Sequence, residues 1–269
     1  MEVKLRPFIA VSIVILLFLP ASCTFDSSRN SKAYIVSIGL DYTPTVVNDL
    51  IGTTDDAVEV SECLKALYSK RGIDTEVLVL TSCTAEELMG LLQSLDLKET
   101  DFLVFYWSGH GHVDENGMFL VAYPSEGERY SELYISDITA YTEKLPCPSV
   151  ILLDCCYAGC GVSDFSLSLG EGSLRKSAVI ASCAENELSL MTHIYTEEGT
   201  IQAHSVFSVV LLEELGWSHS ISVPGGGWVS SDPGRMSASE LGIRIRNKLG
   251  ERSQNPVFDR TDVPVFIVP

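Results

Sequence analysis

The sequence predicts an α/β fold in which a mostly parallel β-sheet lies between two layers of helices. Two observations lead to this prediction: short apolar runs occur without alternating polar positions, and segments with helical spacing separate them along the chain. Uninterrupted apolar strands are typical of parallel sheets buried on both faces, and repeated strand–helix units build such sheets. With 269 residues and 46% hydrophobic content, the chain is long enough to form one sizeable core.

The predicted elements form one continuous series. Helical apolar spacing predicts a first helix over 55–71, and Thr84 followed by Glu87 has the capping-box pattern of a second helix that ends near residue 95. Further helices are expected over 204–215 and 237–249. Strands are expected over 33–39, 75–80, 102–107, 150–153, 178–182 and 263–268, and surface loops over 161–177 and 218–234.

The N-terminal segment has the pattern of an export signal. Lys4 and Arg6 precede an apolar stretch over 8–19, and small residues lead to Cys23. A membrane span needs about 20 apolar residues, so an uncleaved anchor is the alternative. The residues before Cys23, apart from Pro20, are similar to the lipobox of bacterial lipoproteins, which predicts lipidation of Cys23 and attachment to a membrane. We therefore expect an exported protein, periplasmic or at the cell surface, with a signal over 1–23, a linker over 24–32 and one domain over 33–269.

Charge and cysteine content narrow the function further. The net charge of -18 argues against nucleic acid as a partner and favours a cationic substrate or a divalent cation. The alternative is a solvated acidic surface that keeps the protein soluble. Seven cysteines remain after Cys23. An odd number in an exported chain leaves at least one thiol unpaired, which a catalytic cysteine would explain.

Two of the predicted strands end at residues that can carry out catalysis. His110 follows the 102–107 strand in Ser-Gly-His-Gly, and Cys156 follows the 150–153 strand in Asp-Cys-Cys-Tyr-Ala-Gly. In a parallel sheet, ligands bind beyond the carboxyl ends of the strands. The two residues should therefore meet in one crevice, where a histidine can activate a cysteine nucleophile. This arrangement predicts a cysteine hydrolase.

Some of these residues also have other interpretations. Cys155 and Cys160 compete with Cys156 as the nucleophile. Asp55 and Asp56 suit the start of a helix and are not assigned to catalysis. Arg175-Lys176 is a candidate self-cleavage site or an ordinary pair of solvated charges. Zinc could bind to a ligand cluster, although the spacing matches no standard finger; its members would be His110, His112, Cys155, Cys156 and Cys160.

The two motifs together resemble the catalytic core of the caspase-like cysteine peptidases, specifically the metacaspases with their Asp-x-Cys-x-Ser/Ala-Gly. Residues 48–52 with 55–57, 181–184 and 254–256 agree with the family, so the resemblance covers the chain from about Ala33 to Val268. It implies a caspase-like fold: a three-layer sandwich with helices on both faces of the sheet.

The resemblance also implies a role for each motif residue. Cys156 would attack a peptide carbonyl as a thiolate, and His110 would move the proton. The backbone N–H groups of Gly111 and Cys156 would form the oxyanion hole. Asp154 and Ser108 would bind the Arg or Lys before the scissile bond, since a carboxylate pairs with a guanidinium through charge-assisted hydrogen bonds. The expected partner is a polypeptide with a basic residue at its cleavage site.

The chain departs from the family pattern at Ser136. Many metacaspases have two consecutive aspartates where this chain has Ser136 and Asp137, which puts in doubt one pocket carboxylate and any calcium site that shares it. The predicted chemistry requires no cofactor, and calcium stays open as an activator. The alternative functions are an inactive caspase-like module that binds a partner at the cell surface, and a legumain-like or gingipain-like peptidase.

Overall fold

A six-stranded sheet forms the centre of the computed structural model, which describes residues 31–168, 176–195, 201–218, 227–228, 236–259 and 263–266. The strand order is β14-β8-β7-β3-β1-β2, and every neighbouring pair is parallel except β14 with β8. The predicted mostly parallel sheet is thus confirmed. Its strands are β1 (Lys32–Gly39), β2 (Asp74–Leu80), β3 (Phe102–Ser108), β7 (Ser149–Asp154), β8 (Ser177–Ala181) and β14 (Val257–Phe258).

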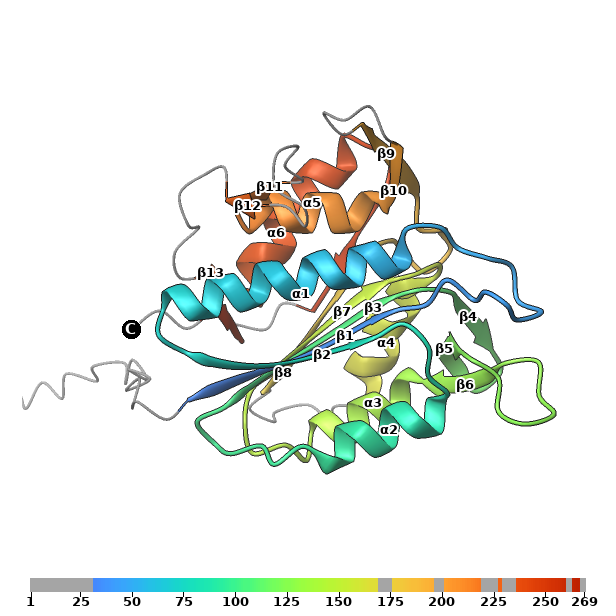
Figure 1. Ribbon diagram of the computed structural model, residues 1–269, viewed down its shortest axis with the longest axis horizontal. Helices are drawn as coiled ribbons and strands as arrows, with labels where there is room; N and C mark the ends of the chain where they lie inside the picture. The colour runs from blue at the N-terminus through green and yellow to red at the C-terminus, as the bar shows by residue number, and fades with distance from the viewer. Residues whose placement is uncertain are drawn as a thin grey trace, which may run out of the picture.

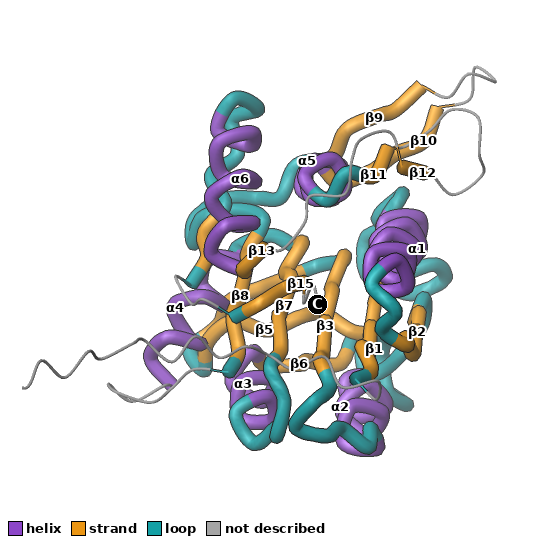
Figure 2. Tube along the Cα trace, turned by 90° about the vertical axis from the view of Figure 1, so that its left-hand side faces the viewer, coloured by secondary structure: helices purple, strands orange, loops and turns teal. Residues whose placement is uncertain are grey.

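Helices of the described residues cover both faces of this sheet (Figures 1 and 2). One layer contains α1 (Thr53–Lys70), α5 (Val206–Glu214) and α6 (Ala238–Gly250). The other contains α2 (Ala85–Ser94), α3 (Ile135–Thr142) and α4 (Ala158–Ser168). Successive strand residues point to opposite faces, so Ile35 and Val104 pack under the first layer while Val36 and Phe105 pack under the second. This is the expected three-layer sandwich.

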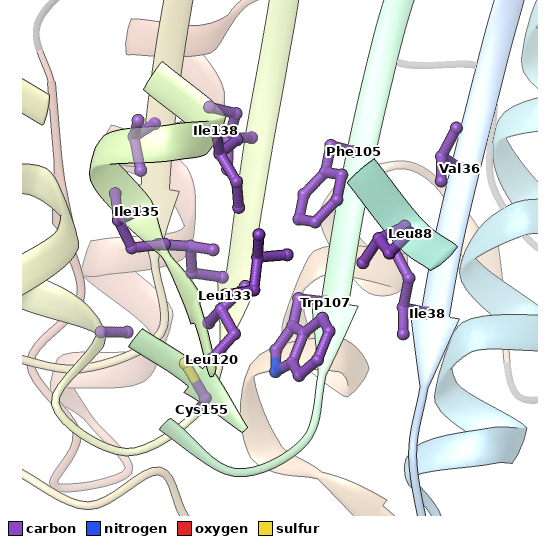
Figure 3. Packing of buried hydrophobic residues seen from close by; sticks show 14 of the residues in the cluster. Val36, Ile38, Leu88, Phe105, Trp107, Leu120, Leu133, Ile135, Ile138 and Cys155 are labelled. Atoms are coloured by element: carbon purple, nitrogen blue, oxygen red, sulfur yellow. The ribbon is translucent and has the colours of Figure 1, made fainter. Parts of the chain in front are cut away.

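The hydrophobic core between the sheet and the layer of α2, α3 and α4 extends to the carboxyl edge of the sheet (Figure 3). Trp107, the penultimate residue of β3, is fully buried and lies close to Leu120 and Cys155. A close-packed core transmits any change of volume to its neighbours. The loops that leave β3 and β7 therefore start from rigid positions.

The structure corrects two predicted boundaries. Residues 161–168, predicted to be part of a surface loop, belong to α4, because Val162 and Phe165 bury one side of that segment. The helix predicted to begin at His204 begins at Val206, because the Ser205 side chain accepts a hydrogen bond from the backbone N–H of Ser208 and caps it. The capping box of Thr84 and Glu87 is present as predicted.

Several short strands lie outside the main sheet. A three-stranded antiparallel sheet consists of β4 (Gly111–Asp114), β5 (Gly117–Ala122) and β6 (Ser131–Tyr134), and a hairpin consists of β9 (Met191–Tyr195) and β10 (Ile201–Ser205). The predicted loop over 218–234 contributes to β11 (Trp217–Ser218) and contains β12 (Gly227–Trp228). The closing strand is β15 (Pro264–Phe266), and it pairs with β13 (Met236–Ser237), whereas β14 pairs with β8.

The predicted export signal with Cys23 and most of the linker lie outside the described residues, as does Arg175. Within the described parts of the chain, no helix has the length and apolar character to span a membrane.

Candidate active site

His110 lies in the two-residue turn between β3 and β4 and is half-buried. Its backbone N–H donates to the Tyr42 hydroxyl at 2.6 Å, and the two rings are 4.6 Å apart between centroids. Its Nε2 lies 2.8 Å from the carbonyl oxygen of Asn48. Because a carbonyl oxygen only accepts, Nε2 carries a proton in this arrangement, and Nδ1 of the neutral imidazole is free of one.

Cys156 lies in the turn from β7 to α4 and is half-buried. The next residue, Tyr157, has a φ of 60°, which is uncommon for a side-chain-bearing residue, and its N–H donates to the carbonyl of Glu187 at 2.8 Å. Burial raises the pKa of the Cys156 thiol, although a hydrogen bond from the backbone of Ser189 acts in the opposite direction. Cys156 therefore needs a base to become a thiolate at neutral pH.

The sheet brings the His110 loop into contact with the Cys156 turn. Strands β3 and β7 pair so that Ser108 lies opposite Asp154, and the N–H of Gly109 donates to the carbonyl of Asp154 at 3.2 Å. A Cβ atom on Gly111 would lie only 2.6 Å from the Cys156 carbonyl oxygen. The backbones of the two motifs thus touch, with His110 and Cys156 both partly open to solvent.

Asp154 and Ser108, the predicted substrate-binding residues, lie beneath this contact and are almost fully buried. Four hydroxyl groups donate to the Asp154 carboxylate: those of Ser189 at 2.9 Å, Ser208 at 2.7 Å, Tyr106 at 3.4 Å, and Ser205. Burial raises the pKa of Asp154, and the hydroxyl groups oppose that shift. The acid is thus held at the base of the site by groups that can both donate and accept hydrogen bonds.

A second buried carboxylate, Asp56, lies close to Asp154. Its Oδ1 is 2.8 Å from Nδ1 of His204, and its Oδ2 accepts from the backbone N–H of Ser205 at 3.0 Å. Burial raises the pKa of Asp56 to about 7, while His204 lowers it. Ser205 therefore links both acids, through its N–H to Asp56 and its hydroxyl to Asp154.

The sequence does not predict this pair, because Asp56 suits the start of a helix and His204 belongs to no motif with a chemical role. No local pattern joins two residues that are 148 positions apart. Only the placement of the β9–β10 hairpin over the start of α1 brings them together.

The competing nucleophiles differ from Cys156 in their surroundings. Cys155 is buried, with its Sγ 2.8 Å from the place of a Gly111 Cβ. Cys160 is half-buried in α4, where its Sγ lies 3.4 Å from the carbonyl of Glu185. Cys156 differs from both in that its backbone carbonyl lies against Gly111 of the His110 loop. Both remain rivals that labelling can test.

The departure from the family pattern at Ser136 lies at an exposed position. Ser136 and Asp137 are both exposed in the first turn of α3. Within the described residues, no group of three or more His, Cys, Asp or Glu side chains is placed to hold a metal ion.

Comparison with known proteins bears on the family and on the fold. The caspase domain family profile matches residues 31–264. The chain belongs to the caspase domain family. This caspase domain also resembles the crystal structure of a Geobacter sulfurreducens protein, with a TM-score of 0.53 and 15% identity over 85% of this chain and 92% of the other. That likeness concerns the fold alone. No curated protein matches the sequence.

Caspase domains are a family of cysteine peptidases, that is, hydrolases of peptide bonds. In this caspase domain the match covers both strands that lead to His110 and Cys156, together with the α1 and β10 segments that hold Asp56 and His204.

Proposed function

We propose that this chain is a cysteine endopeptidase of the metacaspase type that uses His110 and Cys156 and cleaves after Arg or Lys. The contact between the Gly111 backbone and the Cys156 carbonyl carries the proposal, because it joins the two motifs at the open edge of the sheet. A thiol with a raised pKa beside a histidine whose ring is fixed by a carbonyl is suited to base-assisted attack.

The reaction follows from these groups. Nδ1 of His110 takes the thiol proton, and the Cys156 sulfur attacks the scissile carbonyl carbon. The N–H groups of Gly111 and Cys156 donate to the resulting oxyanion. The imidazolium then returns the proton to the leaving amine as the carbon–nitrogen bond breaks, which leaves a thioester. A water molecule, deprotonated by His110, attacks the thioester and releases the acid and the thiol.

Asp154 supports the proposed preference for a basic residue. It stands two positions before the nucleophile, and Ser189 contacts both its carboxylate and Cys156. A guanidinium that approaches the half-buried Ser189 meets a hydroxyl group able to accept its hydrogen bond, with the Asp154 carboxyl group behind it. We propose in addition that residues 1–23 export the protein and that Cys23 is lipidated.

The decisive experiment is labelling of the full chain with an arginyl chloromethyl ketone, followed by mass spectrometry. We expect one label on the wild type and on Cys160→Ala, which removes the half-buried thiol at the start of α4, and none on Cys156→Ala. A label that stays on Cys156→Ala would refute the assignment. An unlabelled wild type would favour the inactive binding module.

The residue preference has a separate test. Peptides with arginine or its uncharged isostere citrulline before the scissile bond should differ strongly in kcat/KM, and Asp154→Asn should reduce that ratio. Faster cleavage after Asn or Asp than after Arg would overturn the proposed specificity, and cleavage after Asn would favour a legumain-like enzyme. Running the assay with calcium and with a chelator tests the proposal that no metal is required.

A further inference from the structure

Tyr42 combines a strained backbone with complete burial beside the candidate active site. It lies in the loop that follows β1, and its φ of 67° falls in the left-handed region, which a bulky side chain rarely occupies. Its side chain is nevertheless buried completely. A backbone strained in this way persists only where the surrounding structure enforces it, and such strain is concentrated at functional sites.

The hydroxyl group of Tyr42 joins two backbone groups that belong to different elements. It accepts a hydrogen bond from the backbone N–H of His110 at 2.6 Å, and it donates to the carbonyl oxygen of Val121 in β5 at 2.8 Å. Burial raises the pKa of Tyr42, so the hydroxyl keeps the proton that it donates. Because a hydroxyl group both donates and accepts, one oxygen atom satisfies both backbone groups.

This hydroxyl group takes the place of one hydrogen bond in the ladder between β4 and β5. Gly111 pairs with Leu120 at the start of β4, so His110 and Val121 are the next residues opposite each other. The Val121 N–H donates directly to the His110 carbonyl at 3.1 Å, as in a hydrogen-bonded antiparallel pair, which normally exchanges both N–H···O bonds. The opposite bond passes through Tyr42. The hydroxyl group therefore holds the His110 amide away from β5.

The ring of Tyr42 also contacts the imidazole that this backbone carries. The centroids of the Tyr42 and His110 rings are 4.6 Å apart, and Tyr123 stacks against Tyr42 at 5.9 Å. A Cβ atom on Gly109 would lie only 2.7 Å from the Tyr42 hydroxyl oxygen, so the loop before His110 fits closely around it. Tyr42 thus supports His110 through both its backbone and its ring.

We propose that Tyr42 is a positioning residue for His110 and Gly111. The inference deepens the proposed function and rests on it, because it concerns the base and the oxyanion donor of the proposed reaction. The buried hydroxyl fixes the His110 amide, which keeps the imidazole on the carbonyl of Asn48 and fixes the direction of the next N–H, that of Gly111.

The first test is Tyr42→Phe, which removes one oxygen atom and keeps the buried ring. Without the hydroxyl group, the His110 amide and the Val121 carbonyl either lack this partner or close into the direct bond of an ordinary ladder, and in both cases the His110 peptide is no longer held in its place. With an Arg peptide as the substrate of the full chain, we expect kcat to fall roughly 100-fold, as for a catalytic group misplaced by about 1 Å, and KM to stay unchanged.

Tyr123→Phe is the matched control. The Tyr123 hydroxyl hydrogen-bonds to Oδ1 of Asp41 at 2.8 Å, so this variant removes a hydroxyl group from the neighbouring ring and leaves the bond from Tyr42 to His110 in place. We expect it to keep the kcat and the KM of the wild type.

A second readout follows His110 without peptide cleavage. In nuclear magnetic resonance spectra of the full chain, the ring nitrogens of His110 are identified by the loss of their signals in His110→Ala. The wild type and Tyr123→Phe should show a protonated Nε2 and an unprotonated Nδ1, whereas the two signals should approach each other in Tyr42→Phe as both tautomers become populated. A residue that only stabilises the fold would change neither this signature nor kcat alone. If Tyr42→Phe does not fold, Gly109→Ala, whose Cβ would displace the hydroxyl group, should show the same two effects.

The outcomes separate the inference from the proposed function. A wild-type kcat with an unchanged tautomer in Tyr42→Phe overturns the inference and leaves the peptidase intact. An equal fall of kcat in Tyr42→Phe and Tyr123→Phe also overturns it, because the loss of either hydroxyl group would then act alike. If the wild type cleaves no peptide, the proposed function fails and the inference fails with it.

Discussion

The turn of Cys156 combines a raised thiol pKa with a backbone that has little freedom. Burial raises the pKa of the Cys156 thiol and disfavours the thiolate, so the proposed mechanism assigns the activating base to His110. The carbonyl of Asn48 holds the imidazole with Nε2 protonated, which leaves Nδ1 able to accept. At this scale, the proposed reactivity depends on the tautomer of one base and on the backbone amides proposed to face the reacting carbonyl.

Substitution of Gly111 tests whether the backbone of this loop contributes to the oxyanion hole. Gly111→Ala would place a Cβ 2.6 Å from the Cys156 carbonyl and 2.8 Å from Cys155 Sγ, so one of the two loops must shift. Displacing one oxyanion donor costs about 2.7–4 kcal/mol of transition-state stabilisation, so kcat should fall about 100-fold or more.

Gly90→Ala is the control for Gly111→Ala, because nothing lies within 4 Å of its Cβ in α2. It should keep full kcat with the same peptide and make the helix slightly more stable. Equal kcat for Gly111→Ala and the wild type would show that this loop does not contribute to the oxyanion hole.

At the scale of elements, α1 and the β9–β10 hairpin are in direct contact at two points, and neither contact involves the main sheet. Gly52, just before α1, approaches Ala203, and Asp56 in the first turn of the helix binds His204 and Ser205. Because Ser205 also contacts Asp154, these two contacts between α1 and the hairpin help to position Asp154 beneath the site.

Gly52→Ala should disrupt the close packing of the start of α1 against β10. The substitution adds a Cβ 2.0 Å from the Ala203 carbonyl oxygen and forces a side-chain-bearing residue to a φ of 95°. We expect the free energy of unfolding, measured by urea denaturation, to fall by at least about 3 kcal/mol. Gly72→Ala has a similar φ of 69° but open space, so it should cost only about 1 kcal/mol. Equal losses would show that the Ala203 contact is unimportant.

The Asp56–His204 pair should make stability depend on pH. Burial raises the pKa of Asp56 from 3.8 to about 7. Burial alone would lower the pKa of His204, but its hydrogen bond with Asp56 raises it overall. Both groups therefore bind a proton more tightly in the folded state, so their stabilising contribution is complete at low pH and is lost as the pH rises through their folded pKa values.

The measurement is the free energy of unfolding of the wild type minus that of Asp56→Asn, followed from pH 4 to 8. The difference should fall by on the order of 2–4 kcal/mol over this range. A difference that stays constant, or that grows with pH, would contradict the raised pKa of Asp56. Subtraction of the variant removes the contribution of the other acidic groups.

The sequence could predict those elements whose pattern is local. Strands β3 and β7 were predicted correctly to within a residue or two because no polar residue interrupts them. Helix α4 was missed because Gly159 and Gly161 lower its helix propensity. Gly159 is needed there for packing, since a Cβ would lie 2.6 Å from the backbone nitrogen of Glu185. The proximity of Asp56 and His204 arises from the tertiary structure alone, so no local sequence pattern could predict it.

At the scale of the whole molecule, the chain has a large excess of acidic residues, and its site is proposed to take basic substrates. The chain carries 36 acidic and 18 basic residues, and Asp154 and Asp56 lie beneath the site itself. Such an excess raises the local concentration of cationic polypeptides and speeds their association, and salt screens the effect.

Salt should therefore affect substrates according to the charge of their flanks. We expect kcat/KM for an Arg peptide with lysines at distant flanking positions to fall about tenfold between 0.02 and 0.5 M NaCl, since the Debye length shortens from roughly 20 Å to roughly 4 Å. The same peptide with glutamine flanks keeps the contact with Asp154 but loses the long-range attraction, so its kcat/KM should change about twofold or less. Because Asp154 is buried, salt screens its short-range contact much less than the surface charges. Parallel curves for the two peptides would mean that the acidic surface serves solubility and does not steer the substrate.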